Sequence, residues 1–286
     1  MDITEFAVTD PDSGPYDVTT GPDGALWFTM ARVGAVGRMS ASGQQVTIAV
    51  GETSAQPTSI TTGPDGALWC TLGRANAIAR VTTDGVVTRF PVGDVMPYGI
   101  TEGPDGALWF SAMRADALMR LTADGALTTL PLGTSGAMPA YVAAGPDGAL
   151  WCPLNQADAV ARVTVDGDVT VHPLPTAGAA PVGIAAGAGQ LWFAEIGAGA
   201  VGRMTVDGAV TEFALPDRDA RPHAVAADAA GGCWFTEWAA GRLGHVDSEG
   251  RFTHHDLPGG EPHGVTIGPD GAVWTAMDTG ALVRLG

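Results

Sequence analysis

Two histidines in the C-terminal third of the chain occupy nearly the same short motif. His223 follows an Arg-Pro pair, and His263 follows a Glu-Pro pair whose glutamate is Glu261. Histidine is the side chain that most readily exchanges a proton near neutral pH, and carboxylates bind divalent cations. The motif therefore indicates proton transfer beside a carboxylate that binds a cation.

Other acidic side chains gather in the same part of the sequence. Glu195 and Glu237 each stand three residues after a tryptophan, and Asp278 stands four residues after another. Oxygen ligands without thiolates suit Mg²⁺ or Ca²⁺ and argue against a structural zinc site. The chain has no Gly-x-Ser-x-Gly motif and no cysteine next to a histidine, which disfavours acyl-enzyme chemistry. Metal-assisted proton abstraction next to a carbonyl and metal-assisted hydrolysis remain.

These residues belong to a repeat that runs through the whole chain. A Gly-Pro-Asp-Gly turn precedes five of the repeated tryptophans; its proline presets φ, and its glycine supplies the positive φ of a tight turn. Each unit also has a proline before a short apolar run, and an arginine or histidine after the tryptophan. The repeated tryptophans, 40 to 42 residues apart, are Trp27, Trp69, Trp109, Trp151, Trp192, Trp234 and Trp274.

Each unit contains four short runs that read as strands, separated by Gly, Pro and Asp. Four strands in about 41 residues are typical of a β-propeller blade. We therefore predict an all-β, seven-bladed β-propeller with four-stranded blades, forming a single domain over residues 1–286. Thr4 marks a fourth-strand pattern ahead of the first unit, and the last unit lacks one. The N-terminal strand is thus expected to complete the last blade, which closes the ring and hides two sheet edges.

In such a ring the residue after each blade proline enters the innermost strand, close to the central axis. Tyr16, Tyr98, His223 and His263 occupy this position. A second inner ring, three and four residues after each tryptophan, is expected to add Glu195, Glu237, Trp238 and Asp278. We predict a funnel in which the two histidines and the acidic groups of the last three blades share one sector. Its apolar walls are expected from Met96, Met113, Met138, Tyr98, Tyr141 and Trp238.

The composition narrows the classes of partner. The formal net charge is -17, and all 14 basic residues are arginine. This charge disfavours nucleic acid and anionic membranes as partners. The first residues lack the pattern of a signal peptide, so we expect a cytoplasmic protein or a mature form without its leader. The three cysteines lie in different units and are expected to be buried apolar residues. Ring closure leaves no free edge, which favours a monomer.

The motifs resemble those of the virginiamycin B lyase family, the streptogramin B lyases. The resemblance rests on the Gly-Pro-Asp-Gly-Ala-Leu-Trp-Phe units, on residues 202–213, and on Arg-Pro-His at 221–223 and Glu-Pro-His at 261–263. It extends over essentially the whole chain. It implies a seven-bladed propeller that linearises type B streptogramins, which are cyclic depsipeptide antibiotics, by elimination at the ester bond. It also implies a carbon-oxygen lyase that requires Mg²⁺ and confers antibiotic resistance.

Carried over to this chain, the resemblance implies that His263 is the general acid/base and that Glu261 and Asp278 bind Mg²⁺. It further implies that His223 and Tyr16 contact the substrate. Asp278 stands where the family pattern has glutamate, so this ligand is one methylene shorter. From their expected place in the funnel, we predict three more substrate contacts, which are Tyr98, Glu237 and Trp238.

Two other functions are compatible with the same residues. One is a Ca²⁺-dependent propeller lactonase that hydrolyses small cyclic esters. The other is a propeller that binds a ligand without catalysis. Hydrolysis adds the mass of one water to the substrate and elimination does not, so the product mass separates the two enzymes.

Overall fold

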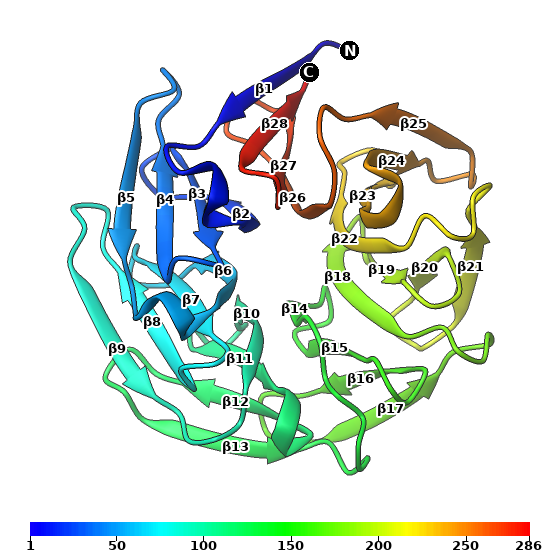
Figure 1. Cartoon of the computed structure of the whole chain (residues 1–286). Coiled ribbons are helices and arrows are strands. Elements are labelled where there is room, and N and C mark those ends of the chain that lie inside the picture. The colour runs from blue at the N-terminus through cyan, green and yellow to red at the C-terminus, as the bar shows by residue number, and fades with distance from the viewer.

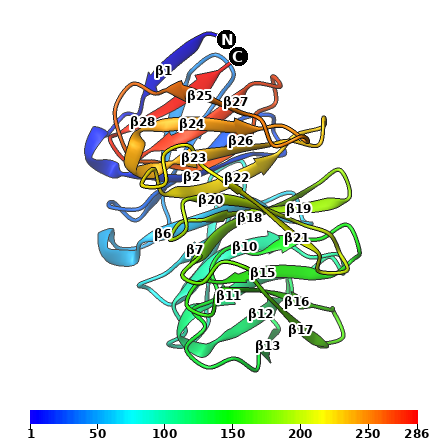
Figure 2. The same cartoon turned by 90° about the vertical axis from the view of Figure 1, so that its right-hand side faces the viewer.

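Short strands surround a central axis, and three more strands extend outward from each of them (Figure 1). The computed structural model describes all 286 residues and contains seven antiparallel sheets of four strands each. The predicted seven-bladed β-propeller is confirmed. Figure 2 shows the ring from the side, with the blades lying next to one another around the axis.

The strands of each blade follow one another from the axis to the rim. The innermost strands are β2 (Pro15–Thr20), β6 (Pro57–Thr62), β10 (Pro97–Glu102), β14 (Ala143–Ala144), β18 (Pro181–Gly187), β22 (Pro222–Ala227) and β26 (Pro262–Ile267). The tryptophan strands are β3 (Leu26–Met30), β7 (Leu68–Leu72), β11 (Leu108–Ala112), β15 (Leu150–Leu154), β19 (Gln190–Glu195), β23 (Cys233–Glu237) and β27 (Val273–Met277).

Two further strands complete each blade. The third strands are β4 (Ala35–Met39), β8 (Ala77–Val81), β12 (Ala117–Leu121), β16 (Ala159–Val163), β20 (Ala200–Met204), β24 (Arg242–Val246) and β28 (Ala281–Leu285). The outermost are β5 (Gln45–Ala49), β9 (Val87–Pro91), β13 (Leu127–Pro131), β17 (Val169–Pro173), β21 (Val210–Ala214), β25 (Phe252–Asp256) and β1 (Ile3–Ala7). Four 3₁₀ turns occur at Pro11–Ser13, Thr53–Ala55, Met113–Ala115 and Trp238–Ala240.

The two ends of the chain close the ring as predicted. Strand β1 pairs with β28 in antiparallel register, from Ile3 opposite Leu285 to Ala7 opposite Ala281, and the termini lie side by side in Figure 1. The Gln45 side chain of blade one donates to the Ala7 carbonyl at 2.8 Å. Closure therefore joins blade seven to blade one through both a strand pair and a side chain.

The Gly-Pro-Asp-Gly motif forms a turn and also binds the tryptophan and arginine of its blade. In blade four, Asp147 accepts a hydrogen bond from the indole of Trp151 at 3.0 Å and forms an ion pair with Arg162. Trp151 is completely buried. A side chain at Gly145 would overlap the indole, with its Cβ 2.4 Å from a ring atom. The motif thus ties three strands of a blade together around one tryptophan.

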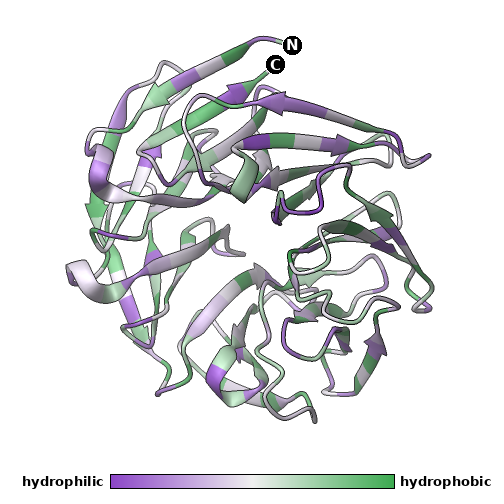
Figure 3. Ribbon diagram, turned by 45° about the vertical axis from the view of Figure 1, so that its right-hand side comes forward, coloured by the Kyte–Doolittle hydropathy of each residue, from purple (hydrophilic) through white to green (hydrophobic).

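The blade interiors are apolar and the outer strands are partly polar, as the hydropathy colouring in Figure 3 shows. The three cysteines are buried and free, which confirms that they are interior residues. Burial raises the pKa of the Cys70 thiol to about 12, so this thiol stays protonated near neutral pH. No helix in the structure is long and apolar enough to cross a membrane.

The innermost strands bulge at the positions predicted to carry function. The register between β26 and β27 shifts between Pro262 and Val265, and the same shift occurs in β22. Thr236 holds two of these bulges together, because its hydroxyl accepts from the Ala224 N–H at 3.0 Å and donates to the His263 carbonyl at 2.8 Å. The same shift occurs in β2, β6, β10 and β18, so the bulge belongs to the repeat, and bulges can re-aim side chains next to an active site.

Blade four departs from the predicted pattern. Its innermost strand, β14, has only two residues, and Pro139 before it forms an isolated bridge with Leu154. Pro153 stands where blades one, two, three and six have threonine or serine and blades five and seven have alanine. Among these residues proline alone lacks the N–H that a ladder needs, and the innermost strand opposite it is short.

Candidate functional site

Five aromatic side chains meet at the axis of the ring. The hydroxyls of Tyr16 and Tyr98 lie 2.7 Å apart, and the Tyr16 hydroxyl lies 3.4 Å from Nε2 of His223. The rings of Tyr16 and His263 stack with centroids 4.3 Å apart, and the two histidine rings are 5.0 Å apart. Tyr141 lies edge-on to both Tyr98 and His223. The structure therefore brings together the four residues that were predicted to follow the blade prolines.

Both histidines are held in the neutral form. Burial lowers the pKa of His223 to about 4. Burial, helped by the charges of His223 and Arg32, lowers the pKa of His263 to about 3. Nδ1 of each ring is buried without a hydrogen-bond partner. A neutral imidazole has one nitrogen able to accept a proton, so both rings are available as acceptors near neutral pH.

Asp17 lies close to the tyrosines and was not singled out from the sequence. It is 8% exposed and accepts hydrogen bonds from the backbone N–H groups of Val18 and Ile60. Burial raises its pKa to about 6. Burial also raises the pKa values of Tyr16 and Tyr141, with a smaller contribution from the charge of Asp17. A signal was present, because Asp17 is the one charged residue two positions after a blade proline.

Asp278 and Glu261 come from neighbouring segments of blade seven. The backbone N–H of Asp278 donates to the Glu261 carbonyl at 3.2 Å. The Glu261 backbone is left-handed, with φ of 57°, and its side chain is exposed. The Asp278 carboxylate forms an ion pair with Arg32 of blade one. A Cβ at Gly14 would lie 2.9 Å from the Arg32 side chain and 3.1 Å from the Asp278 carboxylate, so glycine leaves room for this pair.

The predicted metal ligands are near each other but do not form a complete cage. No three His, Cys, Asp or Glu side chains are grouped so that they could hold a metal ion. Mg²⁺ is usually held by one or two carboxylates and completes its coordination with water or substrate. Glu261 and Asp278 supply this donor set. Arg32 is the cation that Asp278 holds in the structure, so a metal ion would have to share this carboxylate or displace the guanidinium.

A hollow of about 410 Å³ opens beside this group. Its wall includes Tyr16 and His263 from the axial group, the pair Arg32 and Asp278, and Arg74 from blade two. The two arginines were not predicted. They could have been found from their position, five residues after Trp27 and Trp69 respectively.

Glu237 does not reach the funnel, which corrects its predicted place. Its side chain is fully buried in blade six, where it forms an ion pair with Arg242 and lies 3.0 Å from Nδ1 of His254. Successive side chains of a strand alternate between its two faces. Glu237 therefore shares its face with Phe235, which packs against Trp192 and Ala194 of blade five, so this face is turned to the neighbouring blade and not to the funnel.

Trp238 lies beside the axial group, as expected. Its ring centroid is 6.3 Å from that of His263, and the Arg221 guanidinium lies 5.9 Å from its centroid. The indole N–H is buried without a partner. Trp238 and Glu261 line a further hollow, so the surface near His263 continues past the tryptophan. Met138, predicted as an apolar wall, is 39% exposed.

Glu195 is the counterpart of Glu237 in blade five, but it has no partners. It is fully buried, and both carboxylate oxygens lack hydrogen bonds. Ala200 stands opposite it in the ladder, where Glu237 faces Arg242. Burial, with a smaller contribution from the charge of Glu212, raises the pKa of Glu195 to about 8. Glu195 is thus mostly protonated at neutral pH.

Because Glu195 is protonated in the folded protein, the free energy of unfolding should depend on pH. The folded-state pKa of Glu195 lies above its unfolded value, so its contribution is present at low pH and is lost as the pH rises toward 8. Between pH 5 and 9, wild type should lose about 4 kcal/mol of unfolding free energy relative to Glu195→Gln, since the pKa rises from 4.5 to about 8 and one pKa unit corresponds to about 1.4 kcal/mol. Urea unfolding at several pH values measures this.

The control is Glu237→Gln, which removes the ion pair between Arg242 and the matching residue in blade six. This variant should be less stable than wild type throughout the same pH range. Identical pH dependence in Glu195→Gln and wild type would contradict the assignment of a buried, protonated acid.

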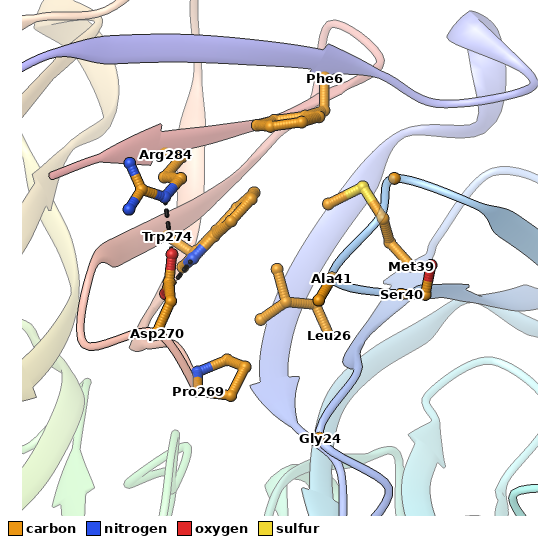
Figure 4. Close-up of a pocket in the computed structure, with 11 residues that line it drawn as sticks. Phe6, Gly24, Leu26, Met39, Ser40, Ala41, Pro269, Asp270, Trp274 and Arg284 are labelled. Carbon is orange, nitrogen blue, oxygen red and sulfur yellow. Dashed lines mark hydrogen bonds and ion pairs between the residues drawn. The ribbon is translucent and has the colours of Figure 1, made fainter.

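A separate pocket lies at the seam between blades seven and one (Figure 4). Phe6 and Trp274 form one wall, with ring centroids 5.1 Å apart, and Leu26 and Met39 come from blade one. Asp270 at its edge already accepts from Trp274 and Arg284. This pocket contains none of the predicted functional residues, and its polar groups serve the repeated motif.

Comparison with known proteins agrees with the geometry. The model of the virginiamycin B lyase family matches residues 1–285. The chain belongs to this family. The resemblance predicted from the motifs is thereby confirmed.

Solved members of the virginiamycin B lyase family have the same architecture. A streptogramin B lyase structure shares 37% identity with a TM-score of 0.96, covering 100% of this chain and 97% of the other. A catalytically inactive variant of the Staphylococcus aureus virginiamycin B lyase, with one histidine replaced by alanine and with quinupristin, shares 34% identity. Its TM-score is 0.93, and the match covers 99% of this chain and 98% of the other.

Sequence similarity to a curated relative is confined to a short segment. The virginiamycin B lyase of Saccharopolyspora erythraea is 48% identical over 47 residues, which are 16% of this chain and 16% of the relative. The aligned segment thus spans about one blade, and the likeness over the whole length rests on the family model and the solved structures.

Proposed function

We propose that this protein is a Mg²⁺-dependent carbon-oxygen lyase that linearises type B streptogramins by elimination at their ester bond and so confers antibiotic resistance. The observation that carries the proposal is the neutral His263 stacked on Tyr16 in a hollow that also contains Asp278. Membership of the virginiamycin B lyase family supports it, as does the solved relative with quinupristin.

In this proposal His263 is the general base. Its imidazole is neutral near pH 7 because burial disfavours the charged form, so it accepts the proton from the α-carbon of the threonine that forms the ester. Stacking on Tyr16 and the hydrogen bond from Thr236 to its carbonyl fix the position of the ring and its backbone. Because the base is already oriented, little entropy is lost in bringing it to the proton in the transition state.

The remaining axial side chains hold the substrate. His223, Tyr16 and Tyr98 form a hydrogen-bonded row, and Trp238 presents its buried, unpaired indole N–H next to His263. An unpaired buried donor is costly unless a ligand uses it. A cyclic depsipeptide offers carbonyl groups to such donors and apolar side chains to the aromatic faces.

Glu261 and Asp278 are the residues that would hold Mg²⁺. When bound, the ion would supply Lewis acidity for negative charge that develops on a carbonyl oxygen. The left-handed backbone at Glu261 and the hydrogen bond to its carbonyl set the two carboxylate-bearing residues next to each other. Asp278 lines the same hollow as Tyr16 and His263, so a cation held there would lie close to the base.

The test is to incubate the purified protein with quinupristin and Mg²⁺ and to follow the macrocycle by liquid chromatography. We expect complete conversion of the macrocycle to a linear product with a different retention time. Intact macrocycle after long incubation at high protein concentration would contradict the proposal. Consumption of small lactones in its place would favour the lactonase, and binding without turnover would favour the ligand-binding propeller.

A further inference from the structure

Three consecutive blades have an arginine five residues after the repeated tryptophan. These are Arg32, Arg74 and Arg114 in blades one, two and three, whereas blades four to seven have glutamine, glycine, alanine and threonine there. The chain has only 14 basic residues and a net charge of -17. Three of those cations thus share one equivalent position in adjacent blades.

The three guanidinium groups differ in their partners. Arg32 forms an ion pair with Asp278, and Arg114 forms one with Asp94 at 2.5 Å. Arg74 forms no ion pair and no side-chain hydrogen bond. Arg74 lines the same hollow as His263. The hollow that contains the proposed base therefore has a free cation on its wall.

The geometry points to Arg74 as the group that binds the carboxylate released from the ester; this rests on the proposed function. His263 takes the proton from the α-carbon, and that electron pair forms the double bond to the β-carbon. The bond between the β-carbon and the ester oxygen breaks, and its electrons stay on the leaving carboxylate. The proton on His263 then returns to solvent, so atoms and charge balance.

The leaving carboxylate needs a cation at this place. It becomes negative in a hollow that already contains the carboxylate of Asp278, in a strongly acidic protein. A guanidinium can bind a carboxylate through two parallel hydrogen bonds. Groups positioned to meet developing charge lower the barrier of the step in which it appears. Arg32 is already bound to Asp278, which leaves Arg74 for the product carboxylate.

The kinetic test compares Arg74→Ala with Arg114→Ala, the equivalent change one blade further on. With quinupristin as substrate, Arg74→Ala should lower kcat by about 10- to 100-fold, the range expected for a charged hydrogen-bonding group. Arg114→Ala should stay within about twofold of wild type, since Arg114 and its partner Asp94 form an exposed ion pair. Arg74→Lys keeps the charge without the bidentate geometry and should recover part of the loss.

A binding test separates this inference from the proposed function. Saponified quinupristin carries the same free carboxylate and is made without enzyme, and its amide is the neutral analogue. By calorimetry in Mg²⁺ buffer, wild type and Arg114→Ala should bind the acid at least about 10-fold more tightly than the amide. Arg74→Ala should bind both equally. An undiminished preference for the acid in Arg74→Ala would overturn the inference, even if the macrocycle is opened. Failure of wild type to open the macrocycle would overturn only the proposed function.

Discussion

Replacing His263 by alanine is expected to reduce turnover of a type B streptogramin by about 1,000-fold, within the range for loss of a general base. The ring lies against Tyr16, His223 and Trp238, and none of these can take over its position. Substrate binding should weaken far less, because the row of Tyr16, Tyr98 and His223 remains. Single-turnover rates and calorimetry with quinupristin measure the two effects separately.

His255→Ala is the control for this prediction. His255 lies on the outer strand β25, where its ring contacts Trp234. Its removal tests whether loss of any imidazole from the fold lowers activity. Turnover should remain close to that of wild type. A His263→Ala variant that keeps a tenth or more of wild-type turnover would show that another group removes the proton.

Removal of divalent cations is expected to lower activity by about 100-fold or more, since a metal ion contributes several kcal/mol to stabilising developing charge. Treatment with EDTA followed by addition of Mg²⁺ should abolish and then restore turnover. Glu261→Gln should require a higher Mg²⁺ concentration for half-maximal activity. Its exposed carboxylate is not engaged in any ion pair, so the change alters the cation site with little effect on packing.

The matched control is Glu102→Gln, at the exposed end of β10. This variant removes one negative charge from the propeller without touching the hollow. Its Mg²⁺ dependence should equal that of wild type. Full activity after exhaustive chelation would contradict the metal requirement and would leave Arg32 as the cation paired with Asp278.

The ring and its closure were predictable because they depend on features that repeat. Trp151, Asp147 and Arg162 form one copy of a motif found in most blades. The regular recurrence of this motif along the sequence gives the length of the repeat. The closure followed from a single fourth-strand pattern displaced to the N-terminus. The axial meeting of Tyr16 and His263 was also predictable, because the position after each proline faces the axis in one blade after another.

Contacts between blades were not predictable in this way. Arg32 and Asp278 are 246 residues apart and meet only because β1 closes the ring. Their pairing also depends on Gly14, whose missing side chain leaves the space. A sequence pattern assigns each residue to a place in its blade, but it does not say which side chain of the next blade lies opposite.

Glu237 shows the same limit within one blade. Its position after the tryptophan suggested the funnel, yet its side chain is fully buried, paired with Arg242 on the next strand and next to His254 on the outer strand. Glu195 at the equivalent place has neither partner. Equal positions in a repeat thus share a backbone place and a direction, while the neighbouring side chains decide whether the group is paired.

The mass of the product tests the central claim most directly. Quinupristin incubated with the protein and Mg²⁺ in H₂¹⁸O should give a linear product with the same mass as the macrocycle, with no ¹⁸O and with a dehydrated threonine in its fragmentation pattern. Elimination by His263 predicts this result. A product heavier by one water that carries ¹⁸O would contradict it and identify a hydrolase.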